Sequence, residues 1–210
     1  MRQRSKKSQQ GFSMVEMVTV VGLMGILACM AIMSTTSSTA AAKANAAMFT
    51  VISQLRTARQ IALTKRRNVL VNFTAPNQIQ LTVETLPGET PATPIAPVYL
   101  NDGVAGGNTF YVFASLPDTP MGFGNSKALN FTPASGGTAG LSIMFSTSGC
   151  LVGTTVSSGF STVGNSNPVN GSIFIGTQGQ QNTARAVTVM GTTGRVRSYS
   201  WTGSTWQEEQ

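Results

Sequence analysis

Histidine is absent from this chain of 210 residues, and only seven side chains are acidic. Without an imidazole there is no histidine to transfer a proton or bind zinc. Six of the seven acidic residues are scattered along the chain, at Glu84, Glu89, Asp102, Asp118, Glu208 and Glu209. No glycine-rich stretch carries the lysine and hydroxyl of a phosphate-binding loop. We therefore expect a protein that is not an enzyme, with no catalytic residue, no metal site and no cofactor.

Cysteine is also scarce, with two residues in the whole chain. Cys29 lies inside an apolar run and Cys150 lies far along the sequence, so we do not expect them to meet within one chain. Cys29 is then a small apolar side chain and Cys150 a buried thiol, with an intermolecular bridge as the alternative. A domain without an internal disulfide must depend on a hydrophobic core.

The longest apolar run is FSMVEMVTVVGLMGILACMAIM, residues 12–33. Its 22 residues would form a helix of about 33 Å at ~1.5 Å per residue, which is enough to cross the hydrocarbon core of a bilayer. Glu16 is its only ionisable residue. A carboxylate at that depth costs about 2.5 to 3.5 kcal/mol, so it either reaches the headgroups or has a partner.

Basic residues are concentrated before this run. Arg2, Arg4, Lys6 and Lys7 supply four of the 14 basic side chains, and the remaining ten exceed the seven acidic ones by three. Four cations before a span and none soon after it predict a cytoplasmic amino end and an exported remainder.

A second helical pattern follows the apolar run. Apolar side chains recur at three- and four-residue steps, at Met48, Val51, Ile52, Leu55, Ala58 and Ala62. This stripe predicts core packing. Lys65, Arg66 and Arg67 end the helix, as cations at the negative end of its dipole. The preceding STTSST at 34–39 favours helix poorly and predicts a loosened turn or a cap.

After Arg67 the hydrophobic period changes to two. NVLVNFT and NQIQLTVE flank APN and predict a hairpin, and six more short runs follow: NTFYVFA, ALNFT, LSIMFS, GSIFIG, ARAVTVM and RVRSYSW. Residues 86–97 and 157–171 are rich in proline, glycine or serine and predict loops. The pattern predicts an α+β fold, in which residues 45–65 pack on an antiparallel sheet.

Gly11, Phe12 and Glu16, with a basic leader before them and an apolar helix after them, resemble the amino-terminal signal of type IV pilins and type II secretion pseudopilins. The resemblance implies that a prepilin peptidase cleaves between Gly11 and Phe12 and methylates the new amine. It also implies that Glu16 pairs with the amine of Phe12 in a neighbouring subunit, which would give the buried carboxylate a partner.

The pilin-like fold that this implies is a long amino-terminal helix, spanning the membrane in its first half, packed on an antiparallel β-sheet domain. The expected organisation is a basic leader that is removed (1–11), a transmembrane and assembly helix (12–33), its amphipathic continuation (34–67) and a β-rich globular domain (68–210). One departure is visible, because pilins commonly carry a proline near the end of the membrane helix where this chain has Met33.

Three internal stretches narrow the resemblance to the GspH/FimT group of minor pseudopilins and minor pilins: QLRTARQIALTKRRNVLVNF at 54–73, FSTSG at 145–149 and TGRVRSYSWTGSTW at 193–206. The resemblance implies a structural subunit of a type IV pilus or type II secretion pseudopilus. Its expected partners are the prepilin peptidase, other pilins or pseudopilins, and the bacterial inner membrane. The globular domain is expected in the periplasm. Which machine the subunit serves stays open.

An alternative function rests on GRVRSYSW. In a strand, Arg195, Arg197, Tyr199 and Trp201 share one face, and Arg185 is expected to join them from a neighbouring strand. Guanidiniums beside aromatics can bind phosphates and bases. The resemblance implies DNA binding through the GRxR element, here Gly194, Arg195 and Arg197, as in a DNA-uptake pilus. The small excess of positive charge in the mature chain favours the structural role alone.

Overall fold

The computed structural model describes residues 12–84, 94–101, 107–132, 140–157 and 160–209. The chain divides into two compact units, Met1–Thr39 and Ala40–Gln210. The described residues form one helix, α1 (Met14–Lys65), and twelve strands, and every strand pairing is antiparallel. The predicted α+β class with antiparallel sheet is therefore confirmed.

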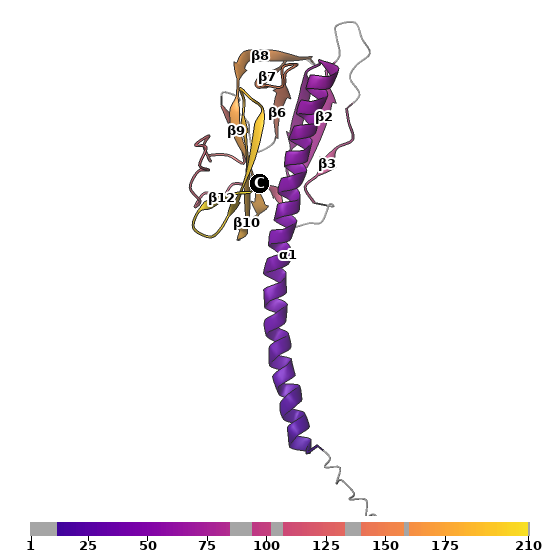
Figure 1. Cartoon of the computed structure of the whole chain (residues 1–210), viewed down its shortest axis with the longest axis vertical. Coiled ribbons are helices and arrows are strands. Elements are labelled where there is room, and N and C mark those ends of the chain that lie inside the picture. The colour runs from indigo at the N-terminus through magenta and orange to yellow at the C-terminus, as the bar shows by residue number, and fades with distance from the viewer. Residues whose placement is uncertain (1–11, 85–93, 102–106, 133–139, 158–159, 210) are drawn as a thin grey trace, which may run out of the picture. The chain divides into compact units, whose positions relative to one another are not determined.

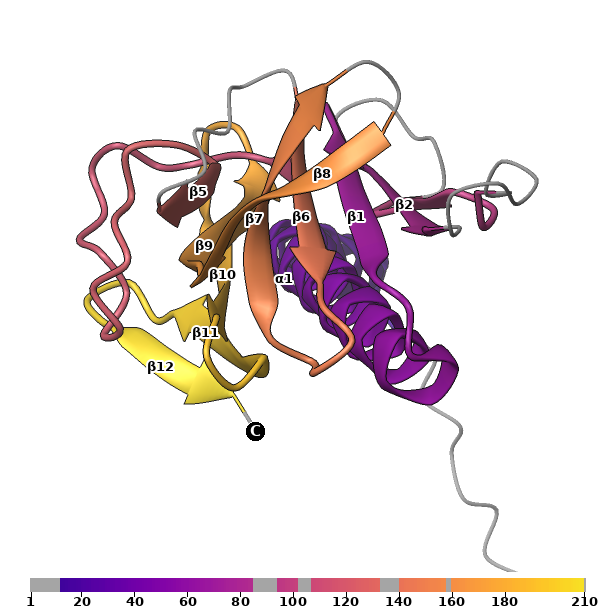
Figure 2. The ribbon, with the colours of Figure 1, turned by 90° about the horizontal axis from the view of Figure 1, so that it is seen from above.

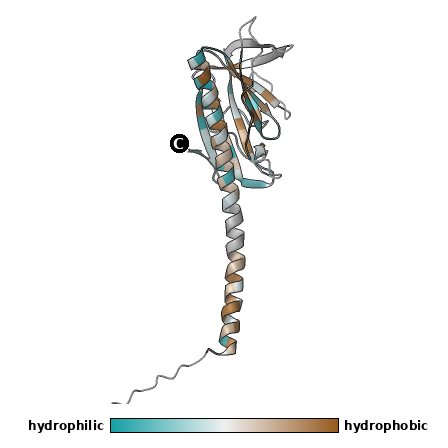
Figure 3. Cartoon of the chain, turned by 90° about the vertical axis from the view of Figure 1, so that its right-hand side faces the viewer, coloured by the Kyte–Doolittle hydropathy of each residue, from teal (hydrophilic) through white to brown (hydrophobic). Residues whose placement is uncertain are grey.

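The first turns of α1 expose apolar side chains in all directions. Residues 12–30 include twelve large apolar side chains that are between 42% and 85% exposed: Phe12, Met14, Val15, Met17, Val18, Val20, Val21, Leu23, Met24, Ile26, Leu27 and Met30. Figure 3 shows the hydrophobic colouring of this part of the helix. In the stretches of helix whose side chains are described, residues 14–30 and 38–65, no segment is both long and apolar enough to cross a membrane.

The serine and threonine run does not interrupt the helix. Residues 34–39 lie inside α1, so the expected loosened turn or cap is wrong. The alanine-rich sequence that follows this run favours helix and is part of α1. α1 ends at Lys65, and Arg66 takes the left-handed conformation with φ of 51°, a position where helices commonly place glycine.

The strands form two six-stranded sheets (Figure 1). The first sheet has the order β3-β2-β1-β6-β7-β8, with the bounds Val98–Tyr99, Gln78–Val83, Val69–Thr74, Gly140–Phe145, Leu151–Ser157 and Phe160–Pro168. The second sheet has the order β12-β11-β10-β9-β4, with the bounds Trp206–Glu209, Arg195–Trp201, Gln180–Met190, Asn170–Thr177 and Thr109–Phe110. β5 (Leu129–Thr132) also pairs with β9. The predicted hairpin is confirmed, since β1 and β2 pair from Thr74–Gln78 outward.

The second half of α1 packs on antiparallel sheet as predicted, and its core includes residues of both sheets (Figure 2), a division into two sheets that the sequence pattern did not predict. All six residues of the predicted apolar stripe are at most 5% exposed. They belong to one hydrophobic core that also includes Val69 and Ile143 of the first sheet and Ile173 and Val187 of the second. Alternation within one strand reports which side is buried, but it does not report which strands share a sheet.

Four strands were not predicted from the sequence, namely β3, β7, β8 and β12. The loop predicted at 157–171 is wrong in its central part, because β8 occupies Phe160–Pro168 at the edge of the first sheet. Backbone pairing with β7 is enough to form such an edge strand, without the apolar alternation on which the prediction depends. The other expected loop, 86–97, lies largely outside the described residues.

An irregular segment covers the outer face of the second sheet. The strand expected at 108–114 is reduced to β4, and residues 111–128, the cover segment, follow without a strand. Val112 and Met121 pack on Phe174, Ala186 and Tyr199. Phe113 and Leu116 pack with Ala184 and with both tryptophans. Two smaller hydrophobic clusters therefore cover part of the outer face of this sheet.

Candidate interaction groove

Three sequence stretches that lie far apart in the chain meet at one point of the Ala40–Gln210 unit. Arg59 comes from α1, Gly149 from the turn between β6 and β7, and Gly194 from the turn between β10 and β11. The Nε atom of Arg59 donates a hydrogen bond of 3.2 Å to the carbonyl oxygen of Gly149. These residues belong to LRTAR, FSTSG and TGRVR respectively, so the three stretches form one junction between the helix and both sheets.

Glycine is required twice at this junction. Gly149 and Gly194 have φ of 78° and 63°, a backbone conformation that residues with a side chain rarely adopt. A Cβ atom on Gly194 would overlap the carbonyl oxygen of Gly149 and lie 2.7 Å from the Nε of Arg59. Only a residue without a side chain lets the β10–β11 turn approach the β6–β7 turn with the arginine between them.

β11 alternates as predicted. Arg195, Arg197 and Tyr199 pair with Met190, Thr188 and Ala186 of β10, and these partners share the outer face of the sheet. Val196, Ser198 and Ser200 point to the opposite side, toward the main core, where Val196 packs. The structure therefore brings Arg195 and Arg197 to one face, with Arg195 exposed and Arg197 half-buried.

Tyr199 and Trp201 share that face but are not part of an open surface. Tyr199 is 2% exposed beneath the cover segment. Trp201 is half-buried and packs edge-to-face on Trp206, with ring centroids 5.4 Å apart. The expectation that Tyr199 offers a stacking surface is therefore wrong. The alternation of β11 predicted correctly which face of the sheet Tyr199 is on, but it did not predict that residues 111–128 cover this side chain.

Arg185 lies on the other side of the sheet. It pairs with Ser200, faces the main core and is 5% exposed. Its Nε donates to Asn45 Oδ1 of α1 at 2.6 Å, and its Nη1 donates to the carbonyls of Asn182 and Ala184. Burial lowers the pKa of Arg185 from its usual value, and the carboxylate of Glu209 opposes this shift. Arg185 therefore does not join Arg195 and Arg197 on one surface, as expected from the sequence, but ties the sheet to the helix.

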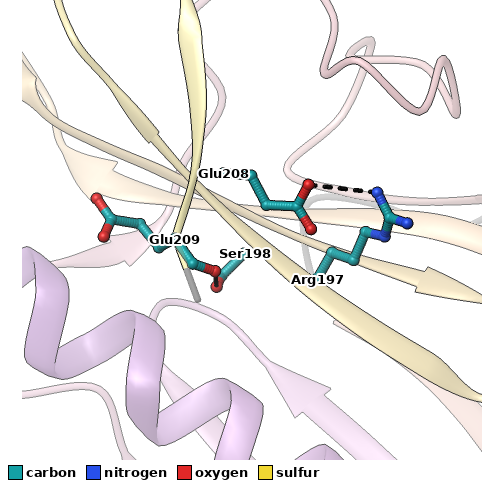
Figure 4. Close-up of polar contacts among 4 residues, drawn as sticks. All are labelled: Arg197, Ser198, Glu208 and Glu209. Atoms are coloured by element: carbon teal, nitrogen blue, oxygen red, sulfur yellow. Dashed lines mark hydrogen bonds and ion pairs between the residues drawn. The ribbon is translucent and has the colours of Figure 1, made fainter.

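The two glutamates of β12 point to opposite sides of the strand (Figure 4). Glu208 Oε2 lies 3.3 Å from Arg197 Nη1, in an ion pair whose side chains are 31% (Arg197) and 45% (Glu208) exposed. Glu209 accepts a hydrogen bond of 2.6 Å from the Ser200 hydroxyl through its carboxylate. Both carboxylates are thus engaged within the sheet.

Between α1 and the β11–β12 edge there is a groove of about 660 Å³. Its lining is mixed: apolar Phe49, Ile52, Leu63 and Val196; basic Arg56, Arg59, Arg195 and Arg197; acidic Glu208 and Glu209; and the uncharged Gln60, Gly194 and Ser198. Arg56 and Arg59 were not predicted as site residues. The signal that could have found them is the LRTAR stretch, which places two arginines within one turn of the predicted helix.

The other predicted site residues lie at the start of the chain. Gly11 is outside the described residues. Phe12 is 79% exposed, and Glu16 lies in the first turn of α1. Within the described residues, no side chain pairs with the Glu16 carboxylate, and no group of three or more metal-ligating side chains is found.

Comparison of the chain with family models, curated proteins and solved structures finds no match.

Proposed function

We propose that the protein is a minor pilin or pseudopilin, a structural subunit that enters a type IV pilus or a type II secretion pseudopilus through its amino-terminal helix. The observation that carries this proposal is the start of α1, where exposed apolar side chains surround a single carboxylate directly after the Gly11–Phe12 junction. Burial of one such side chain contributes about 1.5 to 3 kcal/mol, so twelve of them contribute on the order of tens of kcal/mol to association.

Residues 12–33 are the membrane span of this proposal, and the side chains of its last three residues lie outside those described. The subunit crosses the inner membrane once, with its amino end in the cytoplasm and its β-rich domain in the periplasm. The prepilin peptidase removes residues 1–11. Glu16 then meets the terminal amine of a neighbouring Phe12 when the helix enters a bundle with other pilins or pseudopilins.

DNA binding through β11 is the weaker alternative. Of the five side chains expected to form that surface, Tyr199 and Arg185 are buried, and Arg185 faces the core. Arg197 is held by Glu208. Arg195 remains as the exposed, unpaired guanidinium of the set among the described residues.

Photo-crosslinking in the native envelope tests the assembly role. A crosslinking residue at Met24, which is 64% exposed, should give adducts with the amino-terminal helices of other subunits. Met48 is the matched control, because it is 1% exposed and packs inside the chain's own core. Adducts from Met24 with lipid alone, in cells that carry the assembled machine, would contradict the proposal.

A further inference from the structure

We propose that a small cavity on the outer face of the second sheet is a binding site for a carboxylate on a short apolar stem. The cavity has a volume of about 180 Å³, and its described lining residues are Met121, Thr188, Met190, Thr193, Arg195 and Arg197. All six belong to the Ala40–Gln210 unit, so the site does not depend on the start of α1 or on filament assembly.

A row of polar side chains crosses this face of the sheet. Ser172 of β9 pairs with Asn130 of β5 on one side and with Thr188 of β10 on the other. Thr188 pairs in turn with Arg197 of β11. Residues that are paired across antiparallel strands point to the same side of the sheet. The row therefore leads from the cover segment, where Asn130 donates to the carbonyl of Phe123, to the two arginines of β11.

Two hydroxyls of this row are buried without a partner. Ser172 is 0% exposed, and its Oγ has no hydrogen bond to any described residue. Thr188 is 1% exposed and lines the cavity, and in the part of the chain that the structure describes its side chain has no hydrogen bond either. Nearly all buried polar groups of folded proteins have a partner, because leaving one unpaired is costly. An unpaired hydroxyl in the wall of a cavity therefore points to a group that occupies the cavity.

The polar groups around the cavity favour an anion. Arg195 is exposed, and its side chain has neither an ion pair nor a hydrogen bond among the described residues. Arg197 binds Glu208 through Nη1, which leaves its other guanidinium nitrogens to donate. The hydroxyl of Thr193 accepts from the amide of Arg195 and keeps its own proton to donate. No acidic side chain is among the described lining residues. Guanidinium and hydroxyl donors together match a carboxylate.

The volume and the methionines define the rest of the ligand. Met121 of the cover segment and Met190 of β10 give the cavity apolar walls. An apolar cavity of about 150 Å³ holds one benzene, so about 180 Å³ admits a ligand of about six non-hydrogen atoms. Butyrate has this size, and the side chain of a glutamate is slightly smaller. A phosphodiester carries a nucleoside on either side and is too large, which separates this site from a DNA-binding surface.

Methyl NMR of the full chain in detergent micelles, with butyrate as the probe, tests the site. The methyl signals of Met121 and Met190 should shift on titration, whereas that of Met48, which is buried in the main core, should not. Arg195→Gln should weaken binding at least about tenfold, because a charge-assisted hydrogen bond is lost. Arg56→Gln is the matched control, since Arg56 is also exposed but lies outside the cavity. This control should bind butyrate as wild type does.

Thr188→Val separates a binding site from a structural pocket. Valine has the shape of threonine without the hydroxyl, so the variant should bind butyrate about fivefold more weakly and, without ligand, should be no less stable than wild type. Thr183→Val is the counterpart. Thr183 is equally buried, but its hydroxyl accepts from the amide of Thr177 and donates to the carbonyl of Gln180. This variant should lose stability and keep its affinity for butyrate.

A second probe identifies the source of the carboxylate. A glutamate with blocked amine and α-carboxyl groups presents only its side-chain carboxylate. Tighter binding than butyrate assigns the site to an acidic side chain of a partner protein, and equal or weaker binding assigns it to a free short-chain acid.

Three results would overturn the proposal: butyrate shifts neither methionine methyl of the cavity, Arg56→Gln weakens binding as much as Arg195→Gln, or Thr188→Val binds as tightly as wild type. A DNA oligonucleotide that shifts the same methyl signals at lower concentration than butyrate would also overturn it, in favour of a nucleic-acid site.

Discussion

Both halves of α1 contain many apolar side chains, but these are exposed in the first half and buried against the sheets in the second. In residues 12–30, every large apolar side chain is at least 42% exposed. In residues 44–62, the apolar stripe is at most 5% exposed, and the outward positions Ser53, Arg56 and Gln60 are polar and exposed. An apolar stripe on one side of a helix is buried by packing on one surface, and here the two sheets form that surface. A helix that is apolar on all sides needs surroundings that are apolar on all sides.

This difference separates the interactions that stabilise the folded domain from those that bind the start of the helix to a membrane or to other helices. The Ala40–Gln210 unit has its own core and is expected to keep its stability whatever happens at the start of the helix. The first residues of α1 contribute free energy only when a bilayer or a bundle of neighbouring helices buries them. Substitutions in the two regions should therefore affect different measurements.

Glu16→Ala should have the largest effect, and only on assembly. Removing one partner of a buried ion pair costs about 3 to 5 kcal/mol, so recovery in sheared filaments or crosslinked complexes should fall by about two to four orders of magnitude. The amount of protein in the membrane should not fall, because insertion without the carboxylate is easier. Thr19→Ala is the control, since Thr19 lies in the same region and its hydroxyl only bonds the Glu16 carbonyl. Equal recovery of the Glu16→Ala variant and wild type would refute the pairing.

Leu55→Ala and Leu27→Ala make the same change in the two halves of the helix. Leu55 is 0% exposed, so its loss should lower the free energy of unfolding by about 2 to 5 kcal/mol. Leu27 is 65% exposed, and its replacement should leave unfolding unchanged. Denaturant titration followed by the fluorescence of Trp201 and Trp206 measures both. If Leu27→Ala destabilised the domain as much as Leu55→Ala, the two regions would not be independent.

Gly194→Ala tests the junction of the three distant stretches. A side chain at φ of 63° that also overlaps the Gly149 carbonyl should cost about 1 to 3 kcal/mol of unfolding free energy. Gly179→Ala is the control for backbone strain alone, because Gly179 has a φ of 82° but no atom within 4 Å of the added Cβ, so the difference between the two variants measures the steric overlap. The same denaturant titration applies, and Gly194→Ala should be clearly the more destabilising. Equal losses would mean that the close approach to Arg59 and Gly149 contributes nothing.

Arg197→Ala should have the smallest effect. Its ion pair with Glu208 is partly exposed, and such pairs contribute about 0 to 1 kcal/mol. The difference from wild type should shrink further in 1 M salt, where charges are screened within about 3 Å. A large loss of stability that persists at high salt would show that Arg197 supports the sheet by packing.

The sequence predicted the class of fold and the buried stripe of α1 because these depend on local period. Met48 through Ala62 are buried where the three- and four-residue spacing placed them. The same reasoning missed β8 and the second sheet, because edge strands without apolar alternation and the grouping of strands depend on contacts between distant residues.

At the candidate site, alternation placed Arg195, Arg197 and Tyr199 on one face correctly. It could not show that residues 111–128 cover Tyr199, nor that Arg185 faces α1, because no local pattern encodes which segments pack across a sheet. The meeting of Arg59, Gly149 and Gly194 was equally hidden, although each belongs to a stretch that the resemblance had singled out. Each motif could be identified from the sequence, but only the structure shows that the three lie side by side.

Mass spectrometry of the protein from its native envelope tests the central claim most directly, because assembly through α1 requires a processed amino terminus. The account predicts a mature chain that begins at Phe12 and carries a methyl group on its amine. A chain that retains Met1, or one cleaved after a later small residue, would contradict it.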